Sequence, residues 1–131
     1  MVLDTSAVLA LLLAEPEAPA MISAIAKDPS RLLGAPSLVE AAIVMNARKG
    51  PGGEVALDAL VERLDIRIVD MTGTAAKLGR LGYARFGRGV GEPAVLNYGD
   101  CLAYGVAMAH REPLLYKGDD FSQTDVSSVT Y

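Results

Sequence analysis

Short apolar runs alternate along the chain with longer stretches in which apolar residues recur at helical spacing. Leu57, Leu60 and Leu64 fall on one face of a helical stretch, whereas Ile66–Val69 alternates Ile, Arg, Ile, Val as a strand does. The pattern predicts strands over Met1–Leu3, Arg31–Ala35, Ile66–Val69 and Pro113–Tyr116, with a further edge strand over Val126–Val129. It predicts helices over Ser6–Ala14, Ala18–Lys27, Ser37–Arg48, Glu54–Leu64, Thr74–Phe86 and Tyr98–His110.

The order of these elements indicates an α/β fold. Strands separated by helices need crossover connections, so we expect a central parallel sheet of four to five strands. The 131 residues suffice for one hydrophobic core, and we find no repeat or linker, so we predict one domain over residues 1–131. The glycine-rich segments Gly50–Gly53 and Gly87–Pro93 are predicted to be surface loops.

The composition excludes several kinds of chemistry. Hydrophobic residues make up 51% of the chain, which argues against disorder. The single cysteine, Cys101, excludes an intrachain disulfide and a cysteine-rich metal site, and the single histidine, His110, excludes a multi-histidine site. The start of the chain lacks a positively charged leader, and the longest apolar run, Ala7–Ala14, is too short to span a membrane. We therefore expect a soluble cytoplasmic protein without a membrane partner.

Acidic residues recur at one edge of the predicted sheet. Asp4 directly follows the first strand, Glu40 follows the second, and Asp100 lies in the first turn of the Tyr98–His110 helix. Asp119 and Asp120 follow the Pro113–Tyr116 strand. Because ligands of open parallel sheets bind outside the carboxyl ends of the strands, we expect these carboxylates to share one site.

Each acid also has a purely structural interpretation. Asp4 suits the N-cap of the first helix, and both Ser37–Glu40 and Asn97–Asp100 resemble capping boxes. The Asp119-Asp120 pair suits an ordinary turn. Four acidic positions at one edge are harder to explain by capping alone.

Clustered carboxylates repel one another and raise one another's pKa unless a cation compensates them. An all-oxygen pocket without His or Cys suits a hard ion such as Mg²⁺ or Mn²⁺. Such an ion activates water and neutralises charge during phosphodiester hydrolysis, with one or two ions involved. The composition is consistent with this chemistry because it needs no histidine base.

Four segments in this order and spacing resemble the PIN-domain ribonucleases, in particular the VapC-type toxins of bacterial toxin–antitoxin pairs. The segments are Val2–Ala7, Ser37–Glu40, Leu96–Tyr104 and Leu114–Phe121. The resemblance covers essentially the whole chain and implies a three-layer α/β/α fold. It also implies metal-dependent endonucleolytic cleavage of RNA, such as tRNA or rRNA, that leaves 5′-phosphate and 3′-hydroxyl ends.

The resemblance further implies roles for individual residues. Asp4, Glu40 and Asp100 match the first three catalytic acids of these toxins. The fourth position departs from the commoner family pattern, because Gly118 stands where an acid is usual and two acids follow together. We favour Asp119 as the fourth catalytic acid, with Asp120 as a further candidate metal ligand. The family also implies a homodimer and a VapB-type antitoxin whose C-terminal segment covers the acidic groove.

The formal net charge of −4 does not suggest a nucleic-acid partner. Four cations, however, lie between Asp70 and Glu92 with no acid among them, and these are candidate RNA contacts. They are Lys77, Arg80, Arg85 and Arg88. A solvated helix face is the alternative interpretation.

Two other functions compete with the nuclease. A Mg²⁺-dependent small-molecule phosphohydrolase of the haloacid-dehalogenase type expects a second Asp two residues after Asp4, but that position is Ser6. The other alternative is a non-catalytic PIN-like module that binds RNA or an antitoxin, which the presence of all four acidic positions disfavours.

Overall fold

The computed structural model describes residues 1–90 and 95–131. Four strands form one sheet in the order β3-β2-β1-β4, and every neighbouring pair is parallel. The strands are β1 (Val2–Leu3), β2 (Leu32–Gly34), β3 (Arg67–Val69) and β4 (Leu114–Leu115). The predicted parallel sheet is therefore confirmed with four strands.

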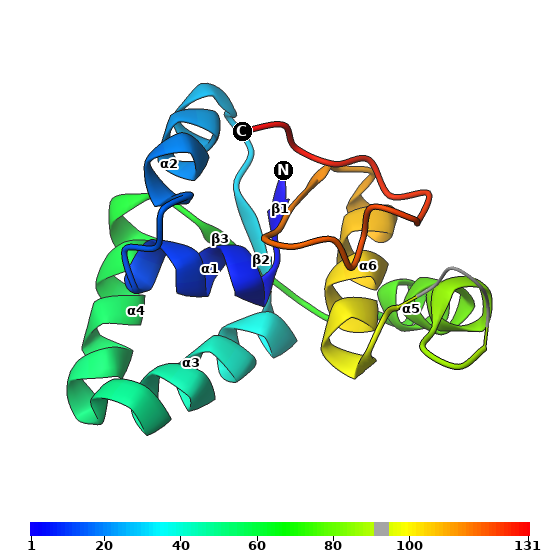
Figure 1. The fold of residues 1–131 in the computed structure, drawn as a ribbon, viewed down its shortest axis with the longest axis horizontal. Helices are drawn as coiled ribbons and strands as arrows, with labels where there is room; N and C mark the ends of the chain where they lie inside the picture. The colour runs from blue at the N-terminus through cyan, green and yellow to red at the C-terminus, as the bar shows by residue number, and fades with distance from the viewer. Residues whose placement is uncertain (91–94) are drawn as a thin grey trace.

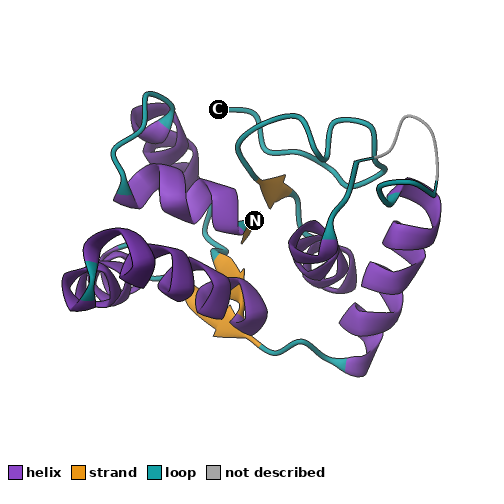
Figure 2. Cartoon of the chain, turned by 60° about the horizontal axis from the view of Figure 1, so that its bottom comes forward, coloured by secondary structure: helices purple, strands orange, loops and turns teal. Residues whose placement is uncertain are grey.

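Six helices among the described residues connect and cover these strands. They are α1 (Thr5–Leu12), α2 (Ala18–Lys27), α3 (Ala35–Lys49), α4 (Pro51–Arg63), α5 (Gly73–Phe86) and α6 (Tyr98–His110). Figures 1 and 2 show the sheet between two groups of helices, with α1 to α4 on one side and α5 and α6 on the other. The arrangement is the expected three-layer α/β/α fold.

Alternation along the strands builds one core on each side of the sheet. Leu3, Leu33 and Leu115 pack into the core beneath α1 to α4, whereas their neighbours Val2 and Leu32 pack into the other. Successive side chains of a strand point to opposite faces, so two adjacent apolar residues contribute to two cores. This explains why very short strands of consecutive leucine and valine suffice here.

Glycine allows α5 and α6 to cross at close range. A Cβ atom at Gly79 would lie 2.5 Å from the carbonyl oxygen of Cys101, and one at Gly82 would lie 2.6 Å from the Tyr104 ring. The backbone of α5 therefore packs directly against α6. This contact fixes the position of the first turn of α6, which carries Asp100.

The structure differs from the sequence prediction at several helix boundaries. α1 begins at Thr5 and ends at Leu12, and α3 begins at Ala35 with Gly34 as its N-cap. Ser37 therefore lies inside α3, and the predicted capping box over Ser37–Glu40 is wrong. Gly50, at φ 61°, ends α3 and caps α4.

One predicted loop and the predicted fifth strand also change. Pro51–Gly53 forms the first turn of α4, so the surface loop predicted over Gly50–Gly53 is wrong. Val126–Val129 forms an isolated parallel bridge between Ser128 and Leu114 instead of a strand. Part of the predicted Gly87–Pro93 loop lies outside the described residues.

A search of the described residues for helices long and apolar enough to span a membrane finds none.

Candidate active site

Asp4 is the first residue after β1 and the N-cap of α1. Its Oδ2 accepts hydrogen bonds from the Ser6 amide at 2.9 Å and the Ser6 hydroxyl at 2.6 Å. The Ser6 hydroxyl in turn accepts the backbone N–H of Lys117 at 2.9 Å, which ties the segment after β4 to this carboxylate. Only 5% of Asp4 is exposed, and this burial raises the pKa of its carboxyl group. Asp4 thus caps a helix and also presents a buried carboxylate at the sheet edge.

Glu40 lies on α3 and reaches the same edge from another direction. Its Oε2 accepts a hydrogen bond from the Thr5 hydroxyl at 2.5 Å. On its other side, a Cβ atom at Gly99 would lie 2.8 Å from Oε1 of Glu40. The missing side chain at Gly99 therefore leaves the space in which the Glu40 carboxylate meets the start of α6.

Asp100 lies in the first turn of α6 and completes a capping box. Its amide donates to Asn97 Oδ1 at 3.0 Å, while its own Oδ2 accepts from the Asn97 amide at 2.8 Å, which confirms the predicted capping geometry. Burial is the largest cause of a pKa of about 6 for Asp100, and the nearby carboxylates of Asp4, Asp120 and Glu40 contribute to the same rise. Asp4 and Glu40 also repel each other electrostatically.

The two acids after β4 occupy different environments. Asp120 is partly buried and close enough to Asp100 to raise its pKa. Asp119 is exposed, and its backbone carbonyl accepts hydrogen bonds from the amide and hydroxyl of Ser122. The buried ring of Phe121 anchors the segment next to Asp120. Of the two acids, Asp120 is therefore the one that interacts electrostatically with Asp100.

The four neighbouring acids, Asp4, Glu40, Asp100 and Asp120, are called the acid cluster below. Lys117 is close in sequence but pairs with Glu15 at 2.8 Å and Glu17 at 3.2 Å. Within residues 1–90 and 95–131, no ion pair joins the cluster to a basic side chain, and no three acids lie at coordinating distance around one point. Carboxylates that repel one another are expected to stand apart in this way.

The donor set fits a hard divalent cation. All four side chains offer oxygen ligands, which Mg²⁺ and Mn²⁺ prefer. Burial raises the pKa of both Asp4 and Asp100, and neighbouring carboxylates raise both in the same direction against the hydrogen bonds that lower them. A bound cation would provide the missing compensation.

The four candidate RNA contacts are all exposed but differ in their surroundings. Lys77 and Arg80 are exposed on α5, but the helix ends at Phe86, so Arg88 lies beyond it. Arg85 forms an ion pair with Asp125 at 2.5 Å and lies over the ring of Phe86.

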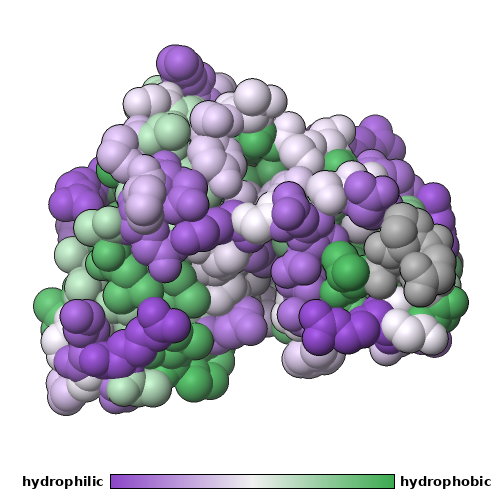
Figure 3. Space-filling model, in the orientation of Figure 1, coloured by the Kyte–Doolittle hydropathy of each residue, from purple (hydrophilic) through white to green (hydrophobic). Residues whose placement is uncertain are grey.

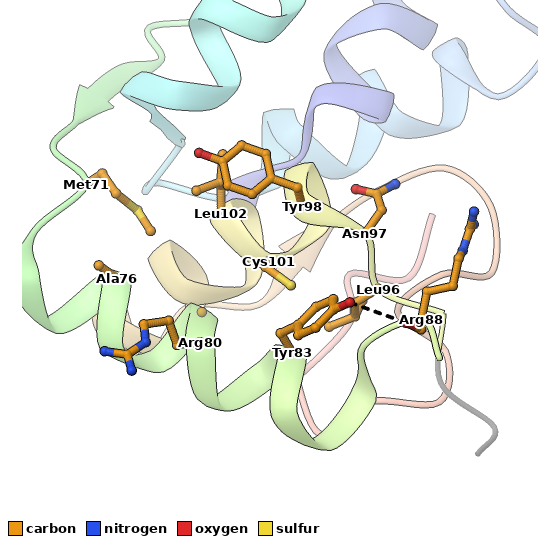
Figure 4. A pocket seen from close by; sticks show the side chains of 11 residues that line it. Met71, Ala76, Arg80, Tyr83, Arg88, Leu96, Asn97, Tyr98, Cys101 and Leu102 are labelled. Atoms are coloured by element: carbon orange, nitrogen blue, oxygen red, sulfur yellow. Dashed lines mark hydrogen bonds between the residues drawn. The ribbon is translucent and has the colours of Figure 1, made fainter. Parts of the chain in front are cut away.

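A groove of about 910 Å³ between α5 and α6 brings Arg80 and Arg88 together with exposed aromatic rings (Figure 4). Tyr83 and Tyr98 both line it. The sequence pattern identified neither tyrosine as a candidate site residue. The helical spacing of Tyr83 from Arg80, three residues apart, was a usable indication that they share a face.

The PIN domain family model matches residues 1–127. The chain belongs to the PIN domain family. It is 45% identical over 126 residues to ribonuclease VapC28 of Mycobacterium tuberculosis, covering 96% of this chain and 95% of that protein. It is 42% identical over 129 residues to ribonuclease VapC of Mycolicibacterium smegmatis, covering 98% of this chain and 99% of that protein. These relatives place this PIN domain among the VapC ribonucleases.

Two solved structures have the same fold as this PIN domain. VapC20 of Mycobacterium tuberculosis, described as a sarcin–ricin loop cleaving toxin, gives a TM-score of 0.77 at 18% identity over 99% of this chain and 98% of that one. VapBC2 of Rickettsia felis, bound to a DNA fragment from its promoter, gives a TM-score of 0.76 at 15% identity. The match covers 98% of this chain and 96% of that one.

Proposed function

We propose that this PIN domain is a metal-dependent endoribonuclease toxin that hydrolyses RNA phosphodiester bonds in the cytoplasm. The observation that carries the proposal is the acid cluster, in which four separate segments deliver carboxylates to one edge of a parallel sheet. The curated VapC ribonucleases that match nearly the whole chain support the reaction type. A hydrolase of this kind needs no side-chain nucleophile.

Asp4, Glu40, Asp100 and Asp120 would hold Mg²⁺ or Mn²⁺, as one ion or two. When bound, the metal supplies charge neutralisation at the phosphate and lowers the pKa of the attacking water. The protein's own contribution is orientation: Ser6 fixes the Asp4 carboxylate, and Thr5 fixes that of Glu40. The Asn97 capping box holds Asp100 in place.

Partners follow from the same relatives. We propose an RNA substrate, with tRNA and rRNA as the classes to test first, a VapB-type antitoxin and a homodimer. Structural neighbours include a VapBC complex and a toxin–antitoxin complex from Klebsiella pneumoniae, which support the antitoxin. Hydrophobic side chains gather over α1, α3 and α4 (Figure 3), and an acidic pocket suits a basic inhibitor segment.

The decisive test compares RNA cleavage by the wild type and by Asp4→Asn and Asp100→Asn in Mg²⁺ or Mn²⁺. Each substitution removes a charge and keeps the size of the side chain. We expect both variants to stay folded, as judged by circular dichroism, and to cleave at least about 100-fold more slowly.

Sequencing of the cleaved RNA ends should find 5′-phosphates in the wild-type sample alone. Wild-type cleavage rates in both variants would refute the acid cluster as the active site. RNA binding without cleavage by the wild type would instead support the non-catalytic module.

A further inference from the structure

The groove between α5 and α6 lies directly beside the acid cluster. Asn97 and Tyr98 line the groove, and they begin the helical turn that carries Asp100. Its floor is apolar and is formed mainly by Met71, Leu96, Cys101 and Leu102. A ligand in this groove would therefore lie next to any phosphodiester bond held at the acids.

Two tyrosines give the groove aromatic surface. Tyr98 is 80% exposed, although it is a large aromatic side chain at the start of a buried helix. Tyr83 is 42% exposed, and its hydroxyl donates a hydrogen bond to the backbone carbonyl of Arg88 at 3.3 Å. This bond holds the turn after α5 against the tyrosine, so the wall of the groove is built by tertiary contacts.

Cations stand at both ends of the aromatic surface. Figure 4 shows Arg80 and Arg88 at opposite ends of the groove, with Tyr83 and Cys101 between them. The lining residues that the structure describes include no acid. Arg80 and Arg88 also make no ion pair with any described side chain. An apolar, aromatic groove with a cation at each end is complementary to a base flanked by phosphates.

We propose that this groove binds a nucleobase of single-stranded RNA next to the cleaved bond, with the base stacked on Tyr98 and the adjoining phosphates on Arg80 and Arg88. The proposal rests on the proposed nuclease function and adds to it a position where the substrate is held. Because stacking accepts every base, the groove positions RNA without selecting one sequence.

A second copy of this chain fits the groove less well than RNA does. In a two-fold symmetric dimer that pairs this groove with its copy, the partners of Arg80 and Arg88 would come from the same lining. The described lining offers no carboxylate to pair with them. The phosphates of an RNA strand would pair with these arginines, whereas the groove of a second copy would leave them unpaired.

The test measures RNA binding in EDTA, where metal-dependent cleavage cannot occur. The probe is a single-stranded RNA of about 12 nucleotides and mixed sequence, with one 2-aminopurine whose fluorescence falls on stacking. We expect Tyr98→Ala to weaken binding about tenfold and to abolish the quenching, while Tyr98→Phe binds within about twofold of the wild type. Tyr131→Ala, an exposed aromatic outside the groove, is the matched control and should have no effect.

The arginines are tested through salt dependence. Arg80→Ala and Arg88→Ala should each reduce the slope of log affinity against log salt by about 0.7, the value for one phosphate contact on a single strand. Arg63→Ala, an exposed arginine of α4, is the control. For an RNA with an abasic site at the probe position, Tyr98→Ala should bind as tightly as the wild type, because no base is left to stack. The arginine variants should still bind this RNA more weakly than the wild type.

Unchanged affinity and quenching in Tyr98→Ala would overturn the proposal. So would conversion of a dimer to monomers by Tyr98→Ala, measured by light scattering, with RNA affinity retained, because a second copy would then occupy the groove. These binding results do not depend on catalysis. If the wild type cleaves RNA but Tyr98→Ala binds RNA normally, the nuclease function is supported and the proposed RNA-binding groove is refuted. If RNA binding depends on Tyr98 but the wild type does not cleave RNA, the groove is supported and the nuclease function is refuted.

Discussion

Asp4 caps the first helix through Ser6 while its carboxylate lies almost fully buried beside those of Glu40 and Asp100. At the scale of single residues, the structural and the chemical interpretations of an acid are therefore compatible. A helix N-terminus stabilises a carboxylate and fixes its direction, which is also what a metal ligand requires. Capping roles do not argue against function in this protein.

The neighbouring acids Asp119 and Asp120 provide a matched pair. We expect Asp120→Asn to weaken Mg²⁺ binding about tenfold or more, because its side chain faces Asp100, and Asp119→Asn to have little effect. The measurement is the Mg²⁺-induced rise in melting temperature, titrated for each variant. A larger loss in Asp119→Asn would instead restore Asp119 as the fourth ligand.

The raised pKa of Asp100, about 6, makes stability depend on pH. The unfolded chain releases this proton at lower pH, so the contribution of Asp100 to metal-free stability is full below its unfolded pKa and is lost as the pH rises through about 6. We expect the melting temperature in EDTA to fall between about pH 5 and 7 more steeply in the wild type than in Asp100→Asn. The Mg²⁺-induced rise should grow over the same range, because only the ionised carboxylate binds the ion. Equal pH dependence in both proteins would contradict the assignment.

At the scale of elements, sequence pattern located every strand and helix but misjudged the segments around proline and glycine. The ranges of α2 and α6 are those predicted. The predicted helices Ser37–Arg48 and Glu54–Leu64 leave out Pro36 and Pro51, yet each proline lies in the first turn of its helix, where a missing N–H costs nothing. Which role a proline takes depends on where the preceding strand or helix ends, and packing decides that.

The first turn of α6 offers a test of how the elements build the acid cluster. In Gly99→Ala the new methyl group would collide with the flexible end of Glu40. Alanine also favours the helix by about 1 kcal/mol over glycine. We expect the melting temperature in EDTA to stay unchanged or rise, while the Mg²⁺-induced rise and RNA cleavage both decrease.

The control is Gly73→Ala, in the first turn of α5, where the added Cβ meets nothing within 4 Å. It should leave both readouts as in the wild type. Gly79→Ala, whose Cβ would meet backbone, should instead lower stability even without metal. Normal Mg²⁺ binding and cleavage in Gly99→Ala would show that Glu40 does not need this space.

At the scale of the whole molecule, the segment after β4 joins the core to the candidate site. Phe121 is 2% exposed and packs against Tyr116, with ring centroids 4.9 Å apart. Farther along, Asp125 accepts the Tyr104 hydroxyl at 2.7 Å. These contacts fold the C-terminal segment over α6 (Figure 1), which brings Asp120 to Asp100.

We therefore expect Phe121→Ala to cost about 3–5 kcal/mol in the free energy of unfolding. Phe121→Leu should cost about 1 kcal/mol and stay folded, so that its metal binding can be measured. Urea denaturation gives the stability, and the Mg²⁺-induced rise in melting temperature should shrink in Phe121→Leu. A full rise in that variant would show that Asp120 is positioned independently of this ring.

The sequence by itself determined the parallel α/β fold, the boundaries of two helices and the edge at which the acids gather. These follow from the local periodicity of apolar residues and from the rule that parallel strands end together. Only the tertiary structure decided that Asp120 comes close enough to Asp100 to raise its pKa, that Arg85 pairs with Asp125, and that Tyr83 and Tyr98 line one groove. Those outcomes depend on contacts between residues far apart in the chain, such as the close crossing at Gly79, which no local pattern encodes.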